Sequence, residues 1–166
     1  MKPRESAPET SRILDDLRRI VRVLRESSRT AERVLGVSGA QLFALKVIAQ
    51  APSLSLGEVA LRTRTHQSTV SVVVKRLVAA GLVRKVVADD DARRAALQVT
   101  ERGRALLRRA PEAGQERLLA GLERLPKARR TALAAHLGEL AIAMGLEGEP
   151  APMFFEDAPR RRSPNA

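Results

Sequence analysis

Residues 67–77 divide into two chemically different faces of one helix. An apolar face repeats at helical spacing and is expected to be buried: Val70, Val73, Val74 and Leu77. The opposite face carries small hydroxyls, a valine and a lysine: Ser68, Ser71, Val72 and Lys75. Hydroxyls can donate or accept at base edges in the major groove of DNA, and a valine can contact a thymine methyl group. The alternative is a solvated helix face, which usually carries more charge than Ser-Ser-Val. The sequence therefore predicts base or groove contacts here, including Thr69 and also Gln67, a candidate for contacting adenine.

Basic residues surround this helix where DNA phosphates would lie. The predicted phosphate contacts are Arg62, Arg64, Lys75, Arg76 and Arg94, with Arg84 or Lys85 as weaker candidates. Contacts of this kind supply much of the affinity for DNA but little sequence information. For the loop arginines the alternative is a side chain that is merely solvated.

Arg93 follows a run of three aspartates between two strand-like segments. At such a turn its guanidinium can enter the minor groove and respond to the narrow, electronegative shape of that groove. Asp91 is predicted to orient this guanidinium. The alternative is an ordinary salt-bridged turn, which is the expectation for Asp89 and Asp90.

Short helices with tight joints are expected around residues 67–77. Two serines fit the capping-box pattern, in which paired side chains satisfy free backbone N–H groups: Ser38 with Gln41, and Ser55 with Glu58. A third helix begins near Thr65 and ends at Gly81. Three such helices within about 45 residues indicate a tri-helical helix-turn-helix core.

After Gly81 the apolar pattern becomes that of strands. Residues 82–87 are rich in β-branched side chains, residues 89–92 resemble a turn, and residues 95–100 alternate apolar and polar. Two strands around a charged turn, directly after a helix-turn-helix, predict a wing.

Long helices flank this unit. Residues 10–35 have apolar residues at spacings of three and four, up to Gly36. Thr100 is expected to cap another helix, and Gly114 and Gly121 weaken the later part of that helix. Pro126 suits the first turn of a last helix, which runs to about Leu146. The first and last helices each carry an apolar stripe that a single chain can hardly cover. Pairing of two chains would bury both stripes, and the alternative is a helical bundle within one chain.

Composition agrees with a helical protein that binds polyanions. The chain has 166 residues, of which 44% are hydrophobic but only 2% aromatic, so its core must consist of Leu, Val and Ala. The net charge is +11, and the excess lies in residues 1–146 rather than in the last twenty. A protein this basic is attracted to polyanions, and nucleic acid is the commonest soluble one.

Several other classes of protein find no support. The absence of cysteine excludes disulfides, thiolate catalysis and cysteine-based metal sites. His66 and His136 are far apart and make no metal site, and no phosphate loop or catalytic set of residues can be placed, so no enzyme and no cofactor are expected. No stretch is long and apolar enough for a membrane span and no signal peptide is visible, so we expect a cytoplasmic protein with no membrane partner.

Five short motifs follow one another along residues 68–103: Ser68-Thr69-Val70-Ser71, Arg76-Leu77, Ala80-Gly81-Leu82-Val83, Asp91-Ala92-Arg93 and Thr100-Glu101-Arg102-Gly103. In this order and spacing they resemble the MarR family of winged helix-turn-helix transcription regulators. The chain differs from the family pattern at Val72, at Ala88-Asp89 and at Val99, and the first two differences bear on DNA preference rather than on the fold. The resemblance covers roughly residues 10–146.

The resemblance implies a homodimer on double-stranded DNA and a small, frequently anionic or phenolic effector between the dimerisation helices and the DNA-binding lobe. Nothing in the residues identifies such an effector. The shortage of aromatic residues argues against recognition by ring stacking, and the missing cysteine rules out the peroxide-sensing variants of the family.

The predicted fold class is mostly α (α+β): a winged helix-turn-helix with a two-stranded wing and long N- and C-terminal dimerisation helices. The expected parts are a disordered arm (1–9), a MarR-like module (10–146) and a disordered tail (147–166). Within the module, residues 10–35 and 104–146 are the dimerisation helices and residues 38–103 the winged helix-turn-helix. The predicted function is sequence-specific transcription regulation as a repressor, by a homodimer on a pseudopalindromic operator, relieved by a small molecule. The alternatives are a non-specific nucleic-acid-binding protein and a protein–protein adaptor on the same fold.

Overall fold

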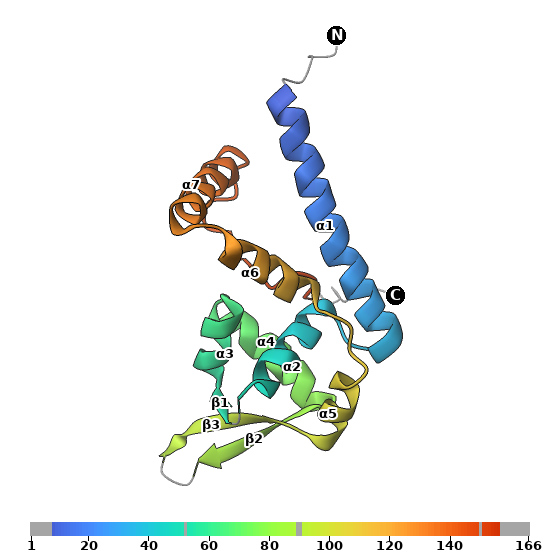
Figure 1. Cartoon of the computed structure of the whole chain (residues 1–166). Helices are drawn as coiled ribbons and strands as arrows, with labels where there is room; N and C mark the ends of the chain where they lie inside the picture. The colour runs from blue at the N-terminus through green and yellow to red at the C-terminus, as the bar shows by residue number, and fades with distance from the viewer. Residues whose placement is uncertain (1–7, 52, 89–90, 150, 157–166) are drawn as a thin grey trace, which may run out of the picture.

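A small lobe carries one long helix and an arm of two further helices (Figure 1). The computed structural model describes residues 8–51, 53–88, 91–149 and 151–156. The elements in chain order are α1 (Pro8–Leu35), α2 (Gly39–Ala49), β1 (Leu54–Ser55), α3 (Leu56–Thr63), α4 (Gln67–Ala79), β2 (Val83–Ala88), β3 (Asp91–Val99), α5 (Glu101–Leu107), α6 (Gly114–Arg124) and α7 (Lys127–Ala143). We call residues 37–107 the lobe and residues 114–143, which form α6 and α7, the arm. The β2–β3 hairpin lies at the end of the lobe away from α7 (Figure 1).

Capping side chains start the helices of the lobe where the sequence predicts. The Ser38 hydroxyl accepts from the Gln41 N–H at 3.2 Å, while the Gln41 side chain accepts from the Ser38 N–H at 2.8 Å. Ser55 and Glu58 form the same reciprocal pair at 3.2 and 2.7 Å. Both predicted capping boxes are confirmed. The third helix begins slightly later than Thr65, since its N-cap is His66. The His66 side chain makes no capping hydrogen bond.

The predicted wing is present, and it belongs to a three-stranded antiparallel sheet of order β1-β3-β2. Strand β2 pairs with β3 from Val83 opposite Val99, and the register shifts between Val87 and Ala88. The short strand β1, which the sequence did not predict, pairs Leu54 with Leu97 on the other edge of β3. The base of β3 is therefore hydrogen-bonded on both sides.

The core lies between the helices of the lobe and this sheet. Its largest fully buried side chains are aliphatic: Leu42, Leu45, Ile48, Leu77, Leu97, Val59, Val70, Val73, Val74 and Val83. These ten side chains come from α2, α3, α4, β2 and β3. As expected from the composition, the core is formed by Leu, Val, Ile and Ala, with Phe43 as the buried aromatic residue among those described.

The region after the wing differs from the prediction of one weakened helix. Thr100 does cap α5, since its hydroxyl accepts from the Gly103 N–H at 3.1 Å, but α5 ends at Leu107. A separate helix, α6, begins at Gly114. A Cβ at Gly114 would lie 3.0 Å from the Ser27 Cβ and 3.2 Å from the Leu24 Cα, so this glycine allows the start of α6 to approach α1 closely. Gly114 therefore starts a helix rather than weakening one.

The chain ends also differ in part from the prediction. Helix α1 already includes Pro8 and Glu9, which were assigned to a disordered arm, while residues 1–7 lie outside the described residues. Helix α7 follows Pro126 as predicted but ends at Ala143 rather than near Leu146. The predicted disordered tail is wrong at Met153, which is only 3% exposed and belongs to the buried cluster. A methionine is unbranched and apolar, so it can enter such a cluster without regular secondary structure around it.

Candidate nucleic-acid interface

Helix α4 has the two faces that its sequence predicts. The apolar side chains Val70, Val73, Val74 and Leu77 are at most 1% exposed. On the other face Gln67, Ser68, Val72 and Lys75 are exposed, and Thr69, Ser71 and Arg76 are half-buried. Val72 keeps 41% of its surface in solvent although valine is apolar. We call Gln67, Ser68, Thr69, Ser71 and Val72 the reading face; helix α4 brings all five together.

The turn after α4 fixes the direction of the wing. Gly81, with a φ of +67°, takes a left-handed conformation that costs glycine little. Its N–H donates to the Val78 carbonyl at 2.9 Å, and the Leu82 N–H donates to the Leu77 carbonyl at 2.9 Å. These bonds satisfy carbonyls at the end of the helix and turn the chain directly into β2.

Thr100 and Gly103 lock the other end of the wing. The Thr100 hydroxyl donates to the Gly81 carbonyl at 2.7 Å, and the Thr100 N–H donates to the Leu82 carbonyl at 3.0 Å. A Cβ at Gly103 would collide with the Leu82 carbonyl oxygen and lie 2.7 Å from the Val99 Cγ1. Packing therefore explains the Thr-x-x-Gly spacing, because Thr100 and Gly103 together hold the end of α4, both wing strands and α5 close to one another.

The residues near the tip of the wing are only partly described. Asp91, Arg93 and Arg94 lie in β3, where Asp91 pairs with Ala88 across the hairpin, but their side chains are outside the described part of the structure, as are Asp89 and Asp90 altogether. Minor-groove insertion by Arg93 and its orientation by Asp91 therefore stay predictions, and so does a phosphate contact by Arg94.

Of the weaker wing candidates, Arg84 is engaged within the sheet. Its Nη2 donates to the Gln98 Oε1 at 2.9 Å, and the Gln98 Nε2 donates to the Ser53 hydroxyl at 3.2 Å. Lys85 is exposed on the neighbouring position of β2. The chain Arg84–Gln98–Ser53 links the wing to the start of β1.

Two predicted phosphate contacts precede α4. Arg62 lies exposed in the last turn of α3. Arg64 is exposed and has a φ of +55°, and its N–H donates to the Leu61 carbonyl at 3.2 Å. Arginine in the left-handed region carries a steric cost that glycine would avoid. This residue forms the joint between α3 and the N-cap of α4.

Behind this joint lies a cavity of about 660 Å³. Its wall combines the α3–α4 turn, helix α6 and residues 151–154. The lining residues are Phe43, Ala60, Leu61, Thr63, Arg64, Thr65, His66, Gln115, Leu118, Leu119, Leu122, Ala151, Pro152, Met153 and Phe154. The lining is mostly apolar, with a few polar groups near the turn, and its volume lies in the range of small-molecule sites.

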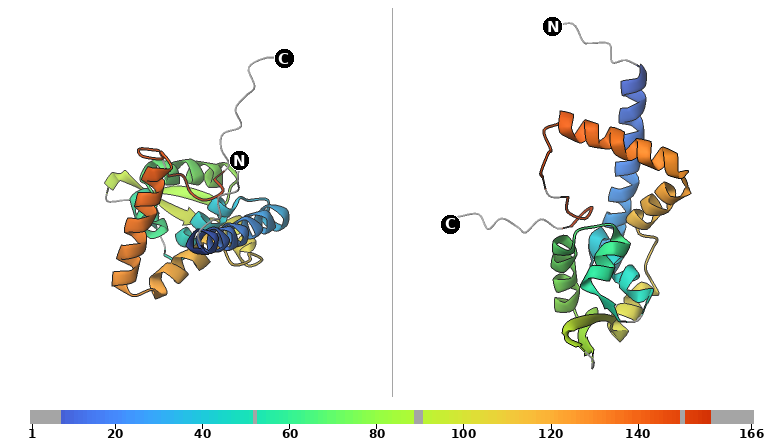
Figure 2. Two further views of the ribbon diagram at one scale, coloured as in Figure 1. Left: turned by 90° about the horizontal axis from the view of Figure 1, so that it is seen from above. Right: turned by 90° about the vertical axis from the view of Figure 1, so that its left-hand side faces the viewer.

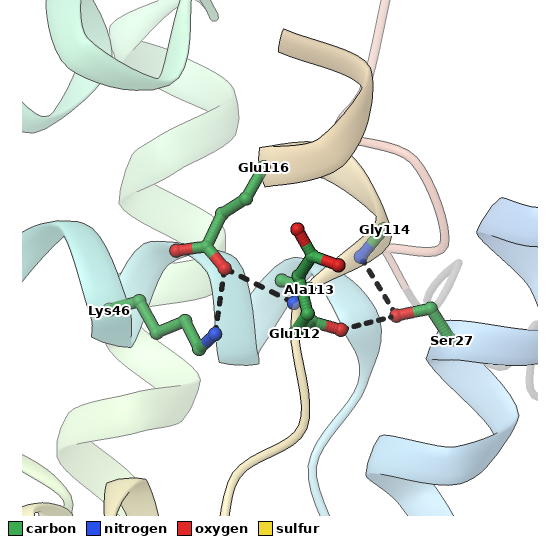
Figure 3. A network of polar contacts seen from close by, with 6 residues as sticks. All are labelled: Ser27, Lys46, Glu112, Ala113, Gly114 and Glu116. Atoms are coloured by element: carbon green, nitrogen blue, oxygen red, sulfur yellow. Dashed lines mark hydrogen bonds and ion pairs between the residues drawn. The ribbon is translucent and has the colours of Figure 1, made fainter. Parts of the chain in front are cut away.

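A polar network that the sequence did not predict ties the lobe and α1 to the arm (Figure 3). The Lys46 Nζ lies 2.7 Å from the Glu116 Oε2, with both side chains only about a quarter exposed, and the same oxygen accepts from the Ala113 N–H at 3.1 Å. The Ser27 hydroxyl donates to the Glu112 carbonyl at 3.1 Å and accepts from the Gly114 N–H at 2.8 Å. A glutamate three residues after Ala113 is a signal of a helix start, but no pattern indicates its partner on α2.

Histidine and acidic side chains are scattered rather than grouped in the described part of the structure. Among residues 8–51, 53–88, 91–149 and 151–156, no three His, Cys, Asp or Glu side chains are grouped so that they could hold a metal ion. His66 is exposed at the N-cap of α4, and His136 on α7 lies 3.5 Å from Glu139. In that same part of the chain no helix is both long and apolar enough to cross a membrane.

A tri-helical lobe followed by a hairpin packed against its third helix is the winged helix-turn-helix arrangement, a class of DNA-binding proteins. Within this class, residues 35–94 match the family model described as MarR family. The resemblance to the MarR family of transcription regulators is therefore confirmed for the segment that holds the reading face. A search of the curated proteins finds no match.

Solved structures share the fold over most of their length. The YusO protein from Bacillus subtilis is 26% identical, with 84% of this chain and 99% of that chain covered and a TM-score of 0.50. The transcriptional regulator BldR from Sulfolobus solfataricus is 22% identical, with 86% and 99% covered and a TM-score of 0.53. FabT from Streptococcus pneumoniae, solved in complex with DNA, is 20% identical, with 81% and 96% covered and a TM-score of 0.55. The coverage shows that the long helices outside the lobe belong to the shared fold.

Proposed function

We propose that this protein is a repressor that acts in the cytoplasm as a homodimer and binds a pseudopalindromic DNA site by sequence. The observation that carries the proposal is the reading face of α4, where small polar groups and the exposed Val72 lie opposite a fully buried apolar face. Such a surface suits close approach to base edges better than a purely electrostatic contact. FabT, which shares the fold, has been solved in complex with DNA.

The proposed assembly rests on apolar side chains that one chain leaves exposed. On α1 these are Ile13, Leu14, Ile20 and Val21, and on α7 they are Leu133, Leu137, Leu140 and Ile142. Although both helices are described in full, α7 has no buried residue at all. The single chain thus gives no support to the alternative of a helical bundle that covers these stripes internally. A second copy would bury them, as in the large apolar interfaces of obligate dimers.

Light scattering at micromolar concentration tests the assembly. We expect twice the monomer mass of 18.1 kDa. Leu137→Glu should shift the mass toward the monomer, because it places a charge in the proposed interface. The control Ala135→Glu introduces the same charge at an exposed position on the side of α7 opposite Leu133 and Leu137, and should leave the mass unchanged. A monomer for the unmodified chain would contradict the dimer.

In the proposed complex, the two copies of α4 lie in successive major grooves and the two wings reach the flanking minor grooves. Lys75 is exposed beside the reading face, so it would hold a phosphate in each subunit. Arg93 would respond to the width of the minor groove. The Ser68 and Val72 positions would set the base preference at about 1 to 3 kcal/mol per good contact.

The decisive experiment selects bound sequences from a random DNA pool and then titrates salt on the selected and a scrambled site. Lys75→Ala should weaken both sites equally and flatten the slope of log affinity against log salt by about two per dimer. Lys127→Ala is the matched control, because it removes the same charge from α7, far along the chain from the reading face. Arg93→Ala should weaken A·T-rich flanks more than G·C-rich ones.

The two alternatives give different results in the same titration. If every variant loses affinity equally on both DNAs, the protein binds nucleic acid by charge alone. If the unmodified chain binds no DNA even at low salt, it is a protein–protein adaptor on a winged-helix fold.

We also propose that a small molecule in the cavity relieves repression. The cavity touches both helix α6 of the arm and the turn that leads into α4, so a bound molecule would contact the elements that set the position of the reading face. Its lining combines leucines with Arg64, His66 and Gln115, which suits an apolar molecule with one polar end.

A further inference from the structure

Residues 151–156, which we call the strap, return from the end of α7 to the lobe (Figure 2). Met153 is 3% exposed and belongs to the same buried cluster as Phe43, although its neighbours Ala151 and Pro152 are exposed. The segment contains no helix or strand. A single apolar side chain therefore inserts into the body of the protein from an otherwise superficial segment.

One hydrogen bond joins the strap to helix α6, and a second shapes the strap itself. The Gln115 Nε2 on α6 donates to the Phe154 carbonyl at 3.0 Å, and within the strap the Glu156 N–H donates to the Met153 carbonyl at 3.0 Å. The first bond fixes the strap to the arm. The second closes a turn that contains Phe155, whose φ of +56° is in the left-handed region. The turn is thus shaped so that Met153 and Phe154 follow one another along the cavity.

The place of the strap gives it a role beyond stability. Ala151, Pro152, Met153 and Phe154 form one wall of the cavity, while Thr63, Arg64, Thr65 and His66 form another. The second wall is the turn that ends at the N-cap of α4. Any molecule that fills the cavity therefore contacts both the strap and the turn that leads into the reading face.

Few contacts keep the strap in place, so its release requires little. Among the described residues, the strap has one buried side chain, Met153, and one side chain–backbone hydrogen bond to another element, from Gln115. Segments held by so few contacts open far more often than the core around them. The leucines of the core, in contrast, are fixed by several helices and the sheet.

We propose that the strap is a displaceable wall of the cavity: with Met153 inserted it bounds the cavity and braces the α3–α4 turn, and an apolar small molecule that displaces it binds in the enlarged site. The displaced strap leaves the turn before α4 without this support. The effect of strap release on DNA binding rests on the proposed function. The docking of the strap, and its competition with a small molecule, are independent of that function.

The absence of cysteine allows a direct test of docking. Met153→Cys and Ala151→Cys place single thiols in the same segment at a buried and an exposed position. With N-ethylmaleimide in excess, the Met153→Cys chain should react at least about tenfold more slowly, because its thiol is reached only when the strap opens. Adding Gln115→Ala should raise its rate toward that of Ala151→Cys. Equal rates for the two single-cysteine chains would overturn the proposal.

A second experiment compares the binding of an apolar dye by the unmodified chain and by variants with one substitution in the strap. Anilinonaphthalene sulfonate, an apolar dye with one anionic group, should bind Met153→Gln several-fold more tightly than the unmodified chain. Ala151→Gln is the matched control and should bind the dye like the unmodified chain. Saturating dye should also raise the maleimide rate of Met153→Cys. If Met153→Gln and the unmodified chain bind the dye equally, the strap does not control entry and the proposal fails. Loss of DNA binding in all chains would contradict the proposed function without changing either readout.

Discussion

The lobe and the arm contain similar apolar residues but bury them very differently. In the lobe, Leu42, Leu45 and Leu77 are completely buried, and the core joins all of its helices to the sheet. In the arm, Leu137 on α7 remains 47% exposed, and neither α6 nor α7, both described in full, contains a buried residue. A single chain therefore determines the structure of the lobe, whereas the apolar stripe of the arm has no partner among the described residues of the chain.

One leucine-to-alanine substitution in the lobe and one in the arm test this difference in burial, and they should give the largest changes. Leu45→Ala should lower the free energy of unfolding by about 3 kcal/mol, because it leaves a cavity in the lobe that cannot collapse fully. Leu137→Ala should instead weaken association, raising the concentration at which the dimer dissociates. Urea unfolding and sedimentation of both variants make the comparison. If Leu137→Ala left the dissociation concentration unchanged, the stripe of the arm would not be an interface.

Adding one methyl group at a glycine of the lobe and at a glycine of the arm tests the same difference in packing. Gly103→Ala should destabilise the protein by about 2 kcal/mol, because the new Cβ meets the Leu82 carbonyl oxygen and the Val99 side chain. Gly121→Ala, inside α6, should stabilise it by about 0.5 to 1 kcal/mol, because nothing lies within 4 Å of the new Cβ and alanine favours the helix. Thermal unfolding of both variants provides the measurement. A destabilising Gly121→Ala would show that the second copy approaches α6 at this point.

The smallest expected effect lies at the boundary between the two regions. Lys46 on α2 and Glu116 on α6 form an ion pair whose side chains are 21% and 25% exposed. A double-mutant cycle with Lys46→Met and Glu116→Gln should give a coupling of about 1 kcal/mol, more than an exposed pair and less than a buried one. The exposed pair Arg19–Asp16 on α1 is the control, with an expected coupling near zero. Equal couplings in the two cycles would mean that this bridge does not join the arm to the lobe.

The sequence was most informative where structure depends on neighbouring residues. Ser38 with Gln41 and Ser55 with Glu58 satisfy backbone groups within one helical turn, so their spacing alone located two helix starts. The division of α4 into a buried and an exposed face followed from helical periodicity in the same way. The buried face of α4 could therefore be predicted residue by residue, while DNA contact by the opposite face stays a prediction.

Features that depend on distant residues could not be predicted in this way. The pairing of Leu54 with Leu97 makes a strand of two residues, too short to produce any alternation. The Ser27 hydroxyl bonds to Gly114 across 87 positions of sequence, and Met153 is buried by residues that precede it by more than thirty positions. Nothing in the composition of the last twenty residues distinguishes Met153 from an exposed residue. The contacts predicted for Arg93 differ from these, because they would form only with bound DNA and not within the chain.

The pairing of β3 on both edges has a consequence for how two half-sites are matched. At its base β3 is bonded to β1 and to β2, and Thr100 joins the hairpin to the end of α4, so the wing cannot rotate against α4 without breaking several hydrogen bonds. In the proposed complex, the offset between the major-groove and the minor-groove contacts is then a constant of each subunit. Adjustment to operators of different length must come from the angle between subunits. In that complex each half-site would be bound by a rigid unit, and only the spacer between the half-sites would vary.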